Sequence, residues 1–316
     1  MGVMTSLDVL KINNSEELVG IINDVVKTVP ELGFFAASPV DKNSYNTLTV
    51  NSLPTVGFRD PSGLRAFDAP GLKQIEVACK YLDASWTLPV AIAQQDDWGE
   101  NNAKALHMKT HLQSAFFWFS KQIWSGVTND ANGFVGLDAL IDAVVDSSSN
   151  REMVITANSG TVADASSVYA VRTGSDACQL AWGSKGQFDE GEVIEQMLYT
   201  QETEGSGSGA TTVTKGAWHY AQKLGGWCGL QVTSKYAAAK IEKLSAASGA
   251  VGLDDDLIYQ LIAKFPVGMT PNGIFMNRRS LEQLRQSRTA YNTTGAPAPT
   301  PTEVAGIPVY VTDAIA

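Results

Sequence analysis

The sequence is poor in charged residues and in the residue types that most often carry out chemistry. Asp, Glu, Lys and Arg make up 18% of its 316 residues, and there are three histidines and three cysteines. An average soluble domain has roughly 25% charged residues, so this chain has little polar surface for its length. A subunit that covers much of its surface with neighbours fits this composition, and so does a large compact enzyme.

The cysteines Cys79, Cys178 and Cys228 lie far apart and form no CxxC pair. Neither a zinc cage nor a disulfide framework is therefore indicated, and each cysteine lies in an apolar stretch where it acts as a small hydrophobe. No run of 18 apolar residues predicts a transmembrane helix. The first residues lack the basic and apolar segments of a signal peptide, so the chain is expected to be cytosolic when made.

The formal net charge of −10 argues against a general nucleic-acid binder, which needs a basic face to displace counterions from phosphates. It is compatible with a position near DNA. A protein surface that lies near DNA but must not adhere to it should be acidic or neutral.

Two candidate ligand sites are incomplete. His107 and His111 are four residues apart on a predicted helix and share a face, but the sequence HMKTH lacks the glutamate of a zinc-protease helix. The glycine-rich segment 205–209 lacks the lysine and hydroxyl residue of a phosphate loop, so it is interpreted as a linker. Neither a metal nor a cofactor is expected.

The acidic clusters also have structural explanations. Asp254, Asp255 and Asp256 lie in the first turn of a predicted helix, where carboxylates favour the positive end of the helix dipole. Glu192 and Glu195, with Glu202 and Glu204, flank a predicted strand, and their spacing does not support the paired acids of glycoside chemistry. We therefore expect no catalytic residue.

Apolar periodicity divides the chain into segments. Residues 1–44 are expected to form an arm with one short helix that begins at Ser15, contains an apolar stripe and ends at Pro30. The stripe consists of Leu18, Ile21, Ile22, Val25 and Val26. Within 45–93, residues 74–81 and 86–92 alternate with period two, residues 45–58 are β-rich in composition, and a turn-rich segment lies between them. Together they predict a long hairpin with an overlong tip and a bend near residues 83–85. A lone hairpin is marginal in water, so it must be covered, either by a neighbouring subunit or by its own domain.

The strongest helix prediction is 98–125, which is apolar on more than one face and must be covered on more than one side. Residues 127–235 are expected to be β-rich, with a hairpin formed by 168–171 and 178–182 and a mobile loop at 202–212. Residues 236–316 predict an α/β segment. Its helices are expected at 235–245, at 254–265 and from Ser280, with Gln283 at the capping-box position, and its strands at 273–277 and 306–313.

This order of elements resembles the major capsid proteins of tailed bacteriophages, which have the Hong Kong 97 fold. The local sequence is similar to a podovirus-like branch of that family over most of 45–316, most specifically in MNRRSLEQL (276–284) followed by GIPVYVTD (306–313). The resemblance implies an α+β fold. Its parts are an N-arm (1–44), an E-loop (45–93), a P-domain (94–235) with a spine helix at 98–125, and an A-domain (236–316) whose final strand closes it or returns towards the P-domain.

The resemblance also implies function and partners. Pentamers and hexamers of the chain would close an icosahedral shell around phage double-stranded DNA, held without sequence-specific binding. A separate scaffolding protein, a portal at one vertex and decoration proteins are implied, with no membrane. The chain would be found in the virion, and in the host cytoplasm during assembly. Predicted assembly contacts are Phe58, Arg59, Asp60, Arg65, Phe67 and Asp68 at the hairpin tip, and Arg278, Arg279, Arg285 and Arg288 near the C-terminus.

Three alternatives stay open on sequence alone. An encapsulin-like nanocompartment shell would share the fold and enclose a cargo enzyme. A hydrolase with a β-rich lobe would depend on Glu192 or Glu195. A tail or baseplate component would form rings or tubes.

Overall fold

The computed structural model describes residues 29–63, 68–97, 99–144, 152–158, 165–183, 188–204, 211–245, 251–292 and 296–315. The chain divides into two compact units, and each is described by itself. The arm helix predicted between Ser15 and Pro30 lies outside the described residues. Pro30 instead precedes the short helix α2 (Glu31–Phe34).

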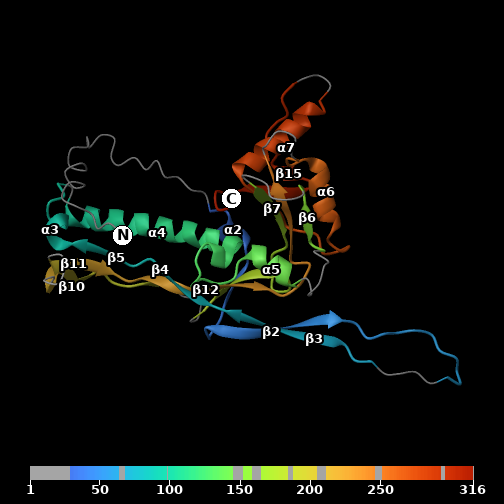
Figure 1. Cartoon of the computed structure of the whole chain (residues 1–316), viewed down its shortest axis with the longest axis horizontal. Coiled ribbons are helices and arrows are strands. Elements are labelled where there is room, and N and C mark those ends of the chain that lie inside the picture. The colour runs from blue at the N-terminus through green and yellow to red at the C-terminus, as the bar shows by residue number, and fades with distance from the viewer. Residues whose placement is uncertain are drawn as a thin grey trace. The chain divides into compact units, whose positions relative to one another are not determined.

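The first unit contains Tyr81–Trp118 and Phe188–Gly226. Among its described strands, β5 (Trp86–Pro89), β11 (Thr211–Gln222) and β10 (Ile194–Glu204) form an antiparallel sheet. The short helix α3 (Val90–Ala93) and the first part of α4 (Glu100–Ser125) pack on one face of this sheet (Figure 1). Its remaining strands are β4 (Lys80–Asp83), β9 (Phe188–Glu190) and the first residues of β12 (Leu224–Val232).

The core of the first unit forms where large side chains of β5 meet small ones of α3 and α4. Trp86 and Leu88 are buried against Ala93 and Ala103. The Trp86 indole donates a hydrogen bond from Nε1 to Gln222 Oε1 at 2.8 Å, which satisfies its one polar atom. This bond and the apolar contacts fix β5 against β11.

The second unit contains Lys27–Lys80, Phe119–Gln187 and Trp227–Ala316. Of its described strands, six form one sheet in the order β15-β16-β14-β7-β13-β6. Their bounds are β6 Val154–Thr156, β7 Ser166–Val171, β13 Ala238–Leu244, β14 Gly273–Met276, β15 Glu303–Val304 and β16 Ile307–Val311. Strands of this sheet come from both sides of the domain boundary predicted at residue 235.

Helices α5 (Leu137–Val144) and α6 (Asp255–Ala263) contact strand β13, which lies between β7 and β6, and α7 (Arg278–Ala290) packs against α6 (Figure 1). A second group of strands pairs β1 (Ala37–Pro39) in parallel with β8 (Cys178–Trp182), and β8 antiparallel with β12. The hairpin of β2 (Ser44–Ser52) and β3 (Gly71–Ala78) belongs to the same unit. A 3-10 turn (Gly126–Thr128) follows α4 at Gly126, whose φ is +55°.

An aromatic cluster forms the core of the second unit. The Trp124 ring lies 5.0 Å from Phe275 and 4.9 Å from Tyr169, measured between ring centroids. Its Nε1 donates to Oε1 of the fully buried Glu31 at 2.8 Å. The cluster therefore ties α2 to α4 and to the six-stranded sheet.

The predicted helix at 235–245 is wrong, because residues 238–244 form strand β13. Lys240, Ile241 and Glu242 pair with the neighbouring strands β6 and β7, and Ala238 to Ile241 are all buried. Alanine and lysine favour helices in isolation, but burial between helices and paired strands overrides an intrinsic preference of a few tenths of a kcal/mol.

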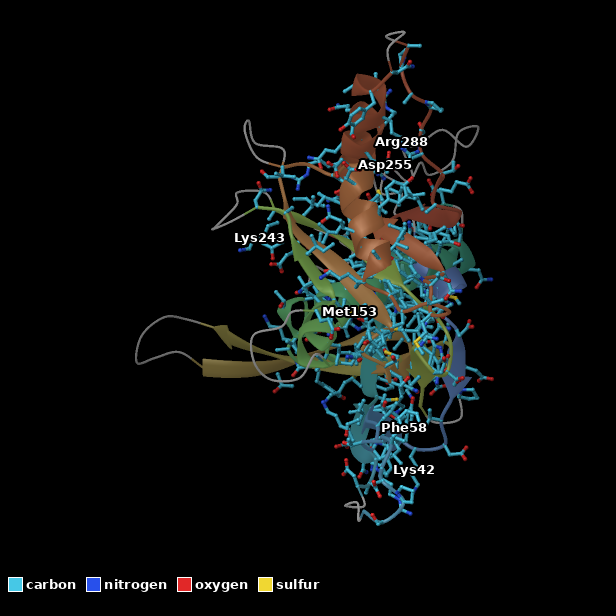
Figure 2. All side chains as sticks on the ribbon, turned by 90° about the vertical axis from the view of Figure 1, so that its right-hand side faces the viewer. Lys42, Phe58, Met153, Lys243, Asp255 and Arg288 are labelled. Carbon is cyan, nitrogen blue, oxygen red and sulfur yellow. The ribbon has the colours of Figure 1, made fainter. Side chains whose placement is uncertain are left out.

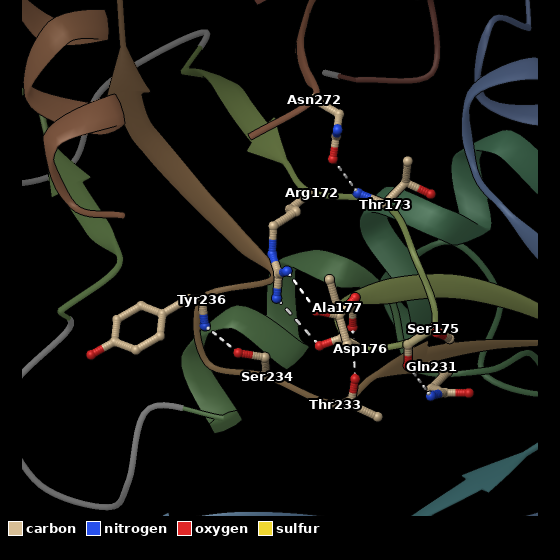
Figure 3. A network of polar contacts seen from close by, with 10 residues as sticks. All are labelled: Arg172, Thr173, Ser175, Asp176, Ala177, Gln231, Thr233, Ser234, Tyr236 and Asn272. Atoms are coloured by element: carbon tan, nitrogen blue, oxygen red, sulfur yellow. Dashed lines mark hydrogen bonds and ion pairs between the residues drawn. The ribbon is translucent and has the colours of Figure 1, made fainter. Parts of the chain in front are cut away.

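The predicted hairpin of 168–171 and 178–182 is also wrong. β7 and β8 follow each other in sequence but belong to different sheets. Figure 3 shows the bonds that fix the turn between them. Thr173 N donates to Asn272 Oδ1 at 3.0 Å, and Thr233 Oγ1 donates to Ala177 O at 3.1 Å. Arg172 Nη1 bonds to Asp176 Oδ2 at 2.7 Å and closes the turn on itself.

Four smaller corrections concern element boundaries. Helix α5 was not predicted, and residues 90–93, expected to continue a strand, form α3. Asn277, not Ser280, caps α7, and Gln283 bonds instead to Leu253 N and Ser245 O. Paired strand covers 202–204 and 211–212 of the segment predicted as a mobile loop, and 205–210 lie outside the described residues.

The helix predicted at 98–125 is present as α4, and the hairpin is present as β2 and β3. The bend expected near residues 83–85 is also present. Asp83 Oδ1 accepts hydrogen bonds from Ser85 N and Oγ there, and the chain leaves β4 to enter β5.

Candidate assembly surfaces

The β2–β3 hairpin has one covered and one open face. Residues paired across an antiparallel ladder point to the same face, and this assigns Tyr45 and Val77 to one face and Val50 and Leu72 to the other. Val77 is buried with Cys79 and Ala181, and Tyr45 packs on them. Figure 1 shows the hairpin extending away from the rest of its unit.

The Tyr45 hydroxyl donates a hydrogen bond to Gln231 Oε1 on β12 and anchors the covered face. Gln179 Nε2 donates to the same Gln231 oxygen at 2.8 Å. Burial raises the pKa of the Tyr45 phenol, with the nearby Cys79 as a further cause, so this hydroxyl stays protonated and able to donate. The base of the hairpin is therefore fixed to its own unit.

The open face carries apolar side chains in water. Leu48, Val50 and Leu72 are 66%, 57% and 58% exposed, and we call them the outer hairpin face. Beyond the strands, Leu53, Val56 and Phe58 are more exposed still. A monomer rarely leaves such a contiguous apolar set uncovered, so this surface has the character of an interface.

The described part of the hairpin tip is held by its own polar contacts. Arg59 Nη1 donates to Gly63 O at 2.7 Å, and Asp60 Oδ1 accepts from the Ser62 hydroxyl at 2.6 Å. The Ser62 bonds lower the pKa of Asp60. Asp68 accepts from Thr55 N, and the bonds from Thr55 lower its pKa also. These contacts shape the tip and leave the Phe58 ring fully exposed (Figure 2). The predicted contacts Arg65 and Phe67 lie outside the described residues.

Three of the four predicted arginines bond to carboxylates of the same chain. Arg278 bonds to Asp313 at 2.9 Å, Arg285 to Glu282 at 2.6 Å and Arg288 to Asp255 at 2.7 Å. Arg279 is half-buried on the same helix α7. Arg278 is the most exposed of the three, with 72% of its side chain accessible. A role of these residues between subunits stays a prediction.

The Arg285 bonds to Glu282 lower the pKa of that carboxyl to about 2. Glu282 therefore stays ionised far into the acid range. Arg285 presents a paired guanidinium to any neighbour, rather than a free positive charge.

The residues considered for chemistry do not form a site. The His107 and His111 ring centroids lie 6.2 Å apart on α4, and the Trp86 ring lies 5.8 Å from His107 with the two planes tilted by 34°. Burial, and to a smaller extent His111, lower the pKa of His107. No group of three His, Cys, Asp or Glu side chains in the described ranges is placed to hold a metal ion. Glu192 lies just before β10 and Glu195 lies on it, and both side chains are exposed.

None of the helices whose placement is described is long and apolar enough to cross a membrane.

The fold is that of a bacteriophage capsid chain, and the predicted α+β class of the Hong Kong 97 type is confirmed. A chain of the near-atomic structure of bacteriophage Epsilon15 matches with a TM-score of 0.67, at 12% identity, over 99% of this chain and 95% of its own length. A chain in the capsid of bacteriophage JBD30, decorated with minor capsid protein trimers, matches with a TM-score of 0.51 at 11% identity, over 99% of both chains. At these identities the likeness is one of fold. No protein-family model matches the sequence. No curated protein matches it either.

Proposed function

We propose that this chain is the major capsid protein of a tailed bacteriophage. Its copies assemble as pentamers and hexamers into an icosahedral shell that encloses double-stranded DNA. The observation that carries the proposal is the outer hairpin face, an uncovered apolar surface on a chain with a phage-capsid fold. Burying apolar surface on a neighbour stabilises association by roughly 25 cal/mol per Å², before the entropic costs of binding.

In this proposal the parts of the chain have the roles of their counterparts in a shell. Residues 1–44 are the N-arm, 45–93 the E-loop that reaches over an adjacent subunit, 94–235 the P-domain and 236–316 the A-domain. A separate scaffolding protein, a portal at one vertex and decoration proteins are the expected partners. The net charge of −10 supports a wall that faces DNA without binding its sequence. The chain is then found in the virion, and in the host cytoplasm during assembly.

Electron microscopy of the purified full chain tests the proposal directly. We expect closed shells tens of nanometres wide for the wild type, since closed point-group symmetry is the usual result of repeated identical contacts. Deleting residues 60–70 should leave soluble capsomers or monomers. A chain that stays monomeric under all assembly conditions contradicts the proposal.

A second pair of variants tests the outer hairpin face without shortening the loop. The double substitution Leu48→Ser and Leu72→Ser should prevent shell closure, because it removes apolar contact area and leaves the ladder intact. Gln74→Ser is the matched control, because Gln74 pairs with Leu48 on the same face but is polar. Normal shells from the double variant would show that this face is not part of the interface between subunits.

Closed shells that contain a cargo enzyme and no DNA would instead favour the encapsulin-like alternative. Terminase and portal genes beside the gene for this chain would favour the phage capsid.

A further inference from the structure

The sequence contains two Asn-Gly pairs, Asn132–Gly133 and Asn272–Gly273, and the fold holds them in different ways. An asparagine before a glycine is prone to ring closure, because glycine has no Cβ to obstruct the attack of its amide nitrogen on the asparagine side chain. Both asparagines are exposed to water, so exposure alone does not separate them. The difference lies in the contacts of each carboxamide and each glycine nitrogen.

Asn132 lies in an exposed turn that runs from Asp130 to Gly133. One main-chain hydrogen bond closes this turn, from Gly133 N to Asp130 O at 3.1 Å, and Asn132 N donates to Asp130 Oδ1 at 2.9 Å. Within the part of the chain that the structure describes, the Asn132 carboxamide makes no hydrogen bond. Ring closure therefore needs one exposed bond to open and a free side chain to turn, and local openings of this kind are frequent in exposed turns.

Asn272 is held at both ends of the same reaction. Its Oδ1 accepts a hydrogen bond from Thr173 N at 3.0 Å (Figure 3), and its own N donates to Val171 O at 2.8 Å. Gly273 is the first residue of β14, is buried and pairs with Val171 on β7. A Cβ at Gly273 would lie 2.6 Å from the Phe34 ring, so the main chain has no room to turn there. Ring closure at this pair requires β14 to leave its sheet.

We propose that Asn132 is a site of spontaneous deamidation in the folded chain, and that its counterpart Asn272 is protected. The Gly133 nitrogen loses its proton to the solvent and attacks Asn132 Cγ. A Cγ–N bond forms, the bond from Cγ to Nδ2 breaks, and ammonia leaves a cyclic succinimide. One water molecule then opens the ring. Opening at Cγ gives aspartate, and opening at the main-chain carbonyl gives isoaspartate, in which the chain runs through the former side chain. This inference does not depend on the proposed capsid function.

The side chain of Gln122 on α4 makes the two products differ in their effect on the fold. Its Nε2 donates to Asp130 O at 3.3 Å and to Phe134 O at 2.8 Å, so it holds the chain on both sides of Asn132. Aspartate keeps the length of the main chain, whereas isoaspartate adds one methylene between these two carbonyls. The isoaspartate form should therefore lose one of the Gln122 bonds. Phe134 is buried, with its ring centroid 5.8 Å from that of Phe119, so a loosened turn weakens core packing.

Peptide mapping by mass spectrometry of the full chain, aged at mildly alkaline pH, tests the proposal. Deamidation raises the mass of a peptide by the difference between an acid and an amide, and methylation by an isoaspartyl methyltransferase identifies the isoaspartate product. We expect Asn132 to be modified at least about tenfold faster than Asn272, because ring closure at Asn272 requires a strand to unpair. The same chain in urea is the control. There both pairs lack their folded contacts, so the difference in rate should disappear.

Two variants complete the test. Asn132→Gln should remove the modification at this position and leave the rate at Asn272 unchanged, because glutamine must close a larger ring. Asn132→Asp carries the charge of the deamidated chain without the added methylene. It should unfold near the temperature of the unaged wild type, and the isoaspartate fraction should unfold at a lower temperature.

A difference below about tenfold in the folded chain, or one that persists in urea, overturns the proposal. So does an unmodified Asn132 in the folded chain after a time that modifies both sites in urea. An isoaspartate fraction as stable as Asn132→Asp overturns the part assigned to Gln122.

Discussion

Arg288 on α7 holds Asp255 on α6 through two parallel hydrogen bonds. Nε donates to Oδ2 and Nη2 to Oδ1, both at 2.7 Å, and both side chains are less than a third exposed (Figure 2). This fork-to-fork geometry fixes the two helices in register. Asp255 lies in the first turn of α6, where its charge also faces the positive end of the helix dipole.

Arg288→Lys should therefore destabilise the fold although it keeps the charge. A lysine ammonium cannot form the two coplanar hydrogen bonds that the guanidinium makes, so we expect a loss of about 1 kcal/mol in the free energy of unfolding. Urea denaturation of the unassembled chain measures it. Arg278→Lys is the control, because Arg278 is mostly exposed and should change stability by less than about 0.5 kcal/mol. Equal effects of the two substitutions would contradict the argument.

Lys240 on β13 is buried, and its ammonium lies 2.9 Å from Asp138 Oδ1 on α5 and 3.9 Å from Glu242. Asp138→Ala should cost about 1–3 kcal/mol, because it leaves a buried charge with a weaker partner. Lys240→Met removes that charge and should change stability by less than about 1 kcal/mol. Thermal unfolding of both variants measures this order. A Lys240→Met variant less stable than Asp138→Ala would show that the ion pair itself is strongly stabilising.

Ala305 has a φ of +52° and Gly306 a φ of +76° in the two-residue turn between β15 and β16. Two consecutive positive φ values define a type I′ turn, which favours Asn-Gly. Ala305→Asn should therefore stabilise the chain by about 0.5–1 kcal/mol. Calorimetry should show a higher unfolding temperature, and Ala305→Val, with a branched Cβ, should lower it. The reverse order would rule out the turn geometry.

His107 should make the unassembled chain less stable as the pH falls below about 6.5. Its pKa is lowered by burial, so below the ordinary histidine value of 6.5 the unfolded chain binds a proton that the folded chain does not. The stability it contributes is present above that pH and is lost as the pH falls through its folded pKa. His107→Gln should flatten the decline in unfolding free energy between pH 7 and 5. His219→Gln is the control, and an unchanged slope for His107→Gln would contradict this expectation.

Arg285→Glu should impair capsomer formation and leave the monomer fold intact. The new carboxylate would lie one helical turn from Glu282 and would turn a neutral ion pair on α7 into two negative charges. Like charges at this spacing cost only a few tenths of a kcal/mol within the helix, so the monomer should remain folded. Light scattering follows assembly, with Arg285→Gln as the uncharged control. Unchanged assembly kinetics would count against an interface role.

The sequence was sufficient where a pattern has only one interpretation. The period of α4 and the alternation in β3 each predict the observed element, because 26 residues at helical spacing are typical of a long helix and period two is typical of a strand with two distinct faces. The α+β class and the capsid-like order of elements also followed from sequence. The need for cover over the hairpin was also predicted, since a long lone hairpin is marginal in water.

The sequence was insufficient where residues far away in the chain determine the local structure. Ala238–Leu244 has helical composition, and only the flanking strands β6 and β7 make it a strand. The predicted hairpin failed because Asn272 and Thr233, far along the chain, hold the 173–177 turn and direct β8 to another sheet. The pairing of Arg288 with Asp255 was equally hidden, because neither residue's local sequence identifies its partner. Propensity and spacing carry no information about contacts of this kind.

The parallel pairing of β1 with β8 joins Ala37 to Leu180, across more than 140 residues of intervening chain. During synthesis, β1 leaves the ribosome long before its partner exists, so its backbone groups must stay hydrated or be held by other proteins until β8 follows. Pairings of such high contact order are slow to form, and a half-made chain exposes strand edges that can pair wrongly. We therefore expect newly made chains to depend on chaperones, and the yield of folded chain to fall steeply as the growth temperature rises.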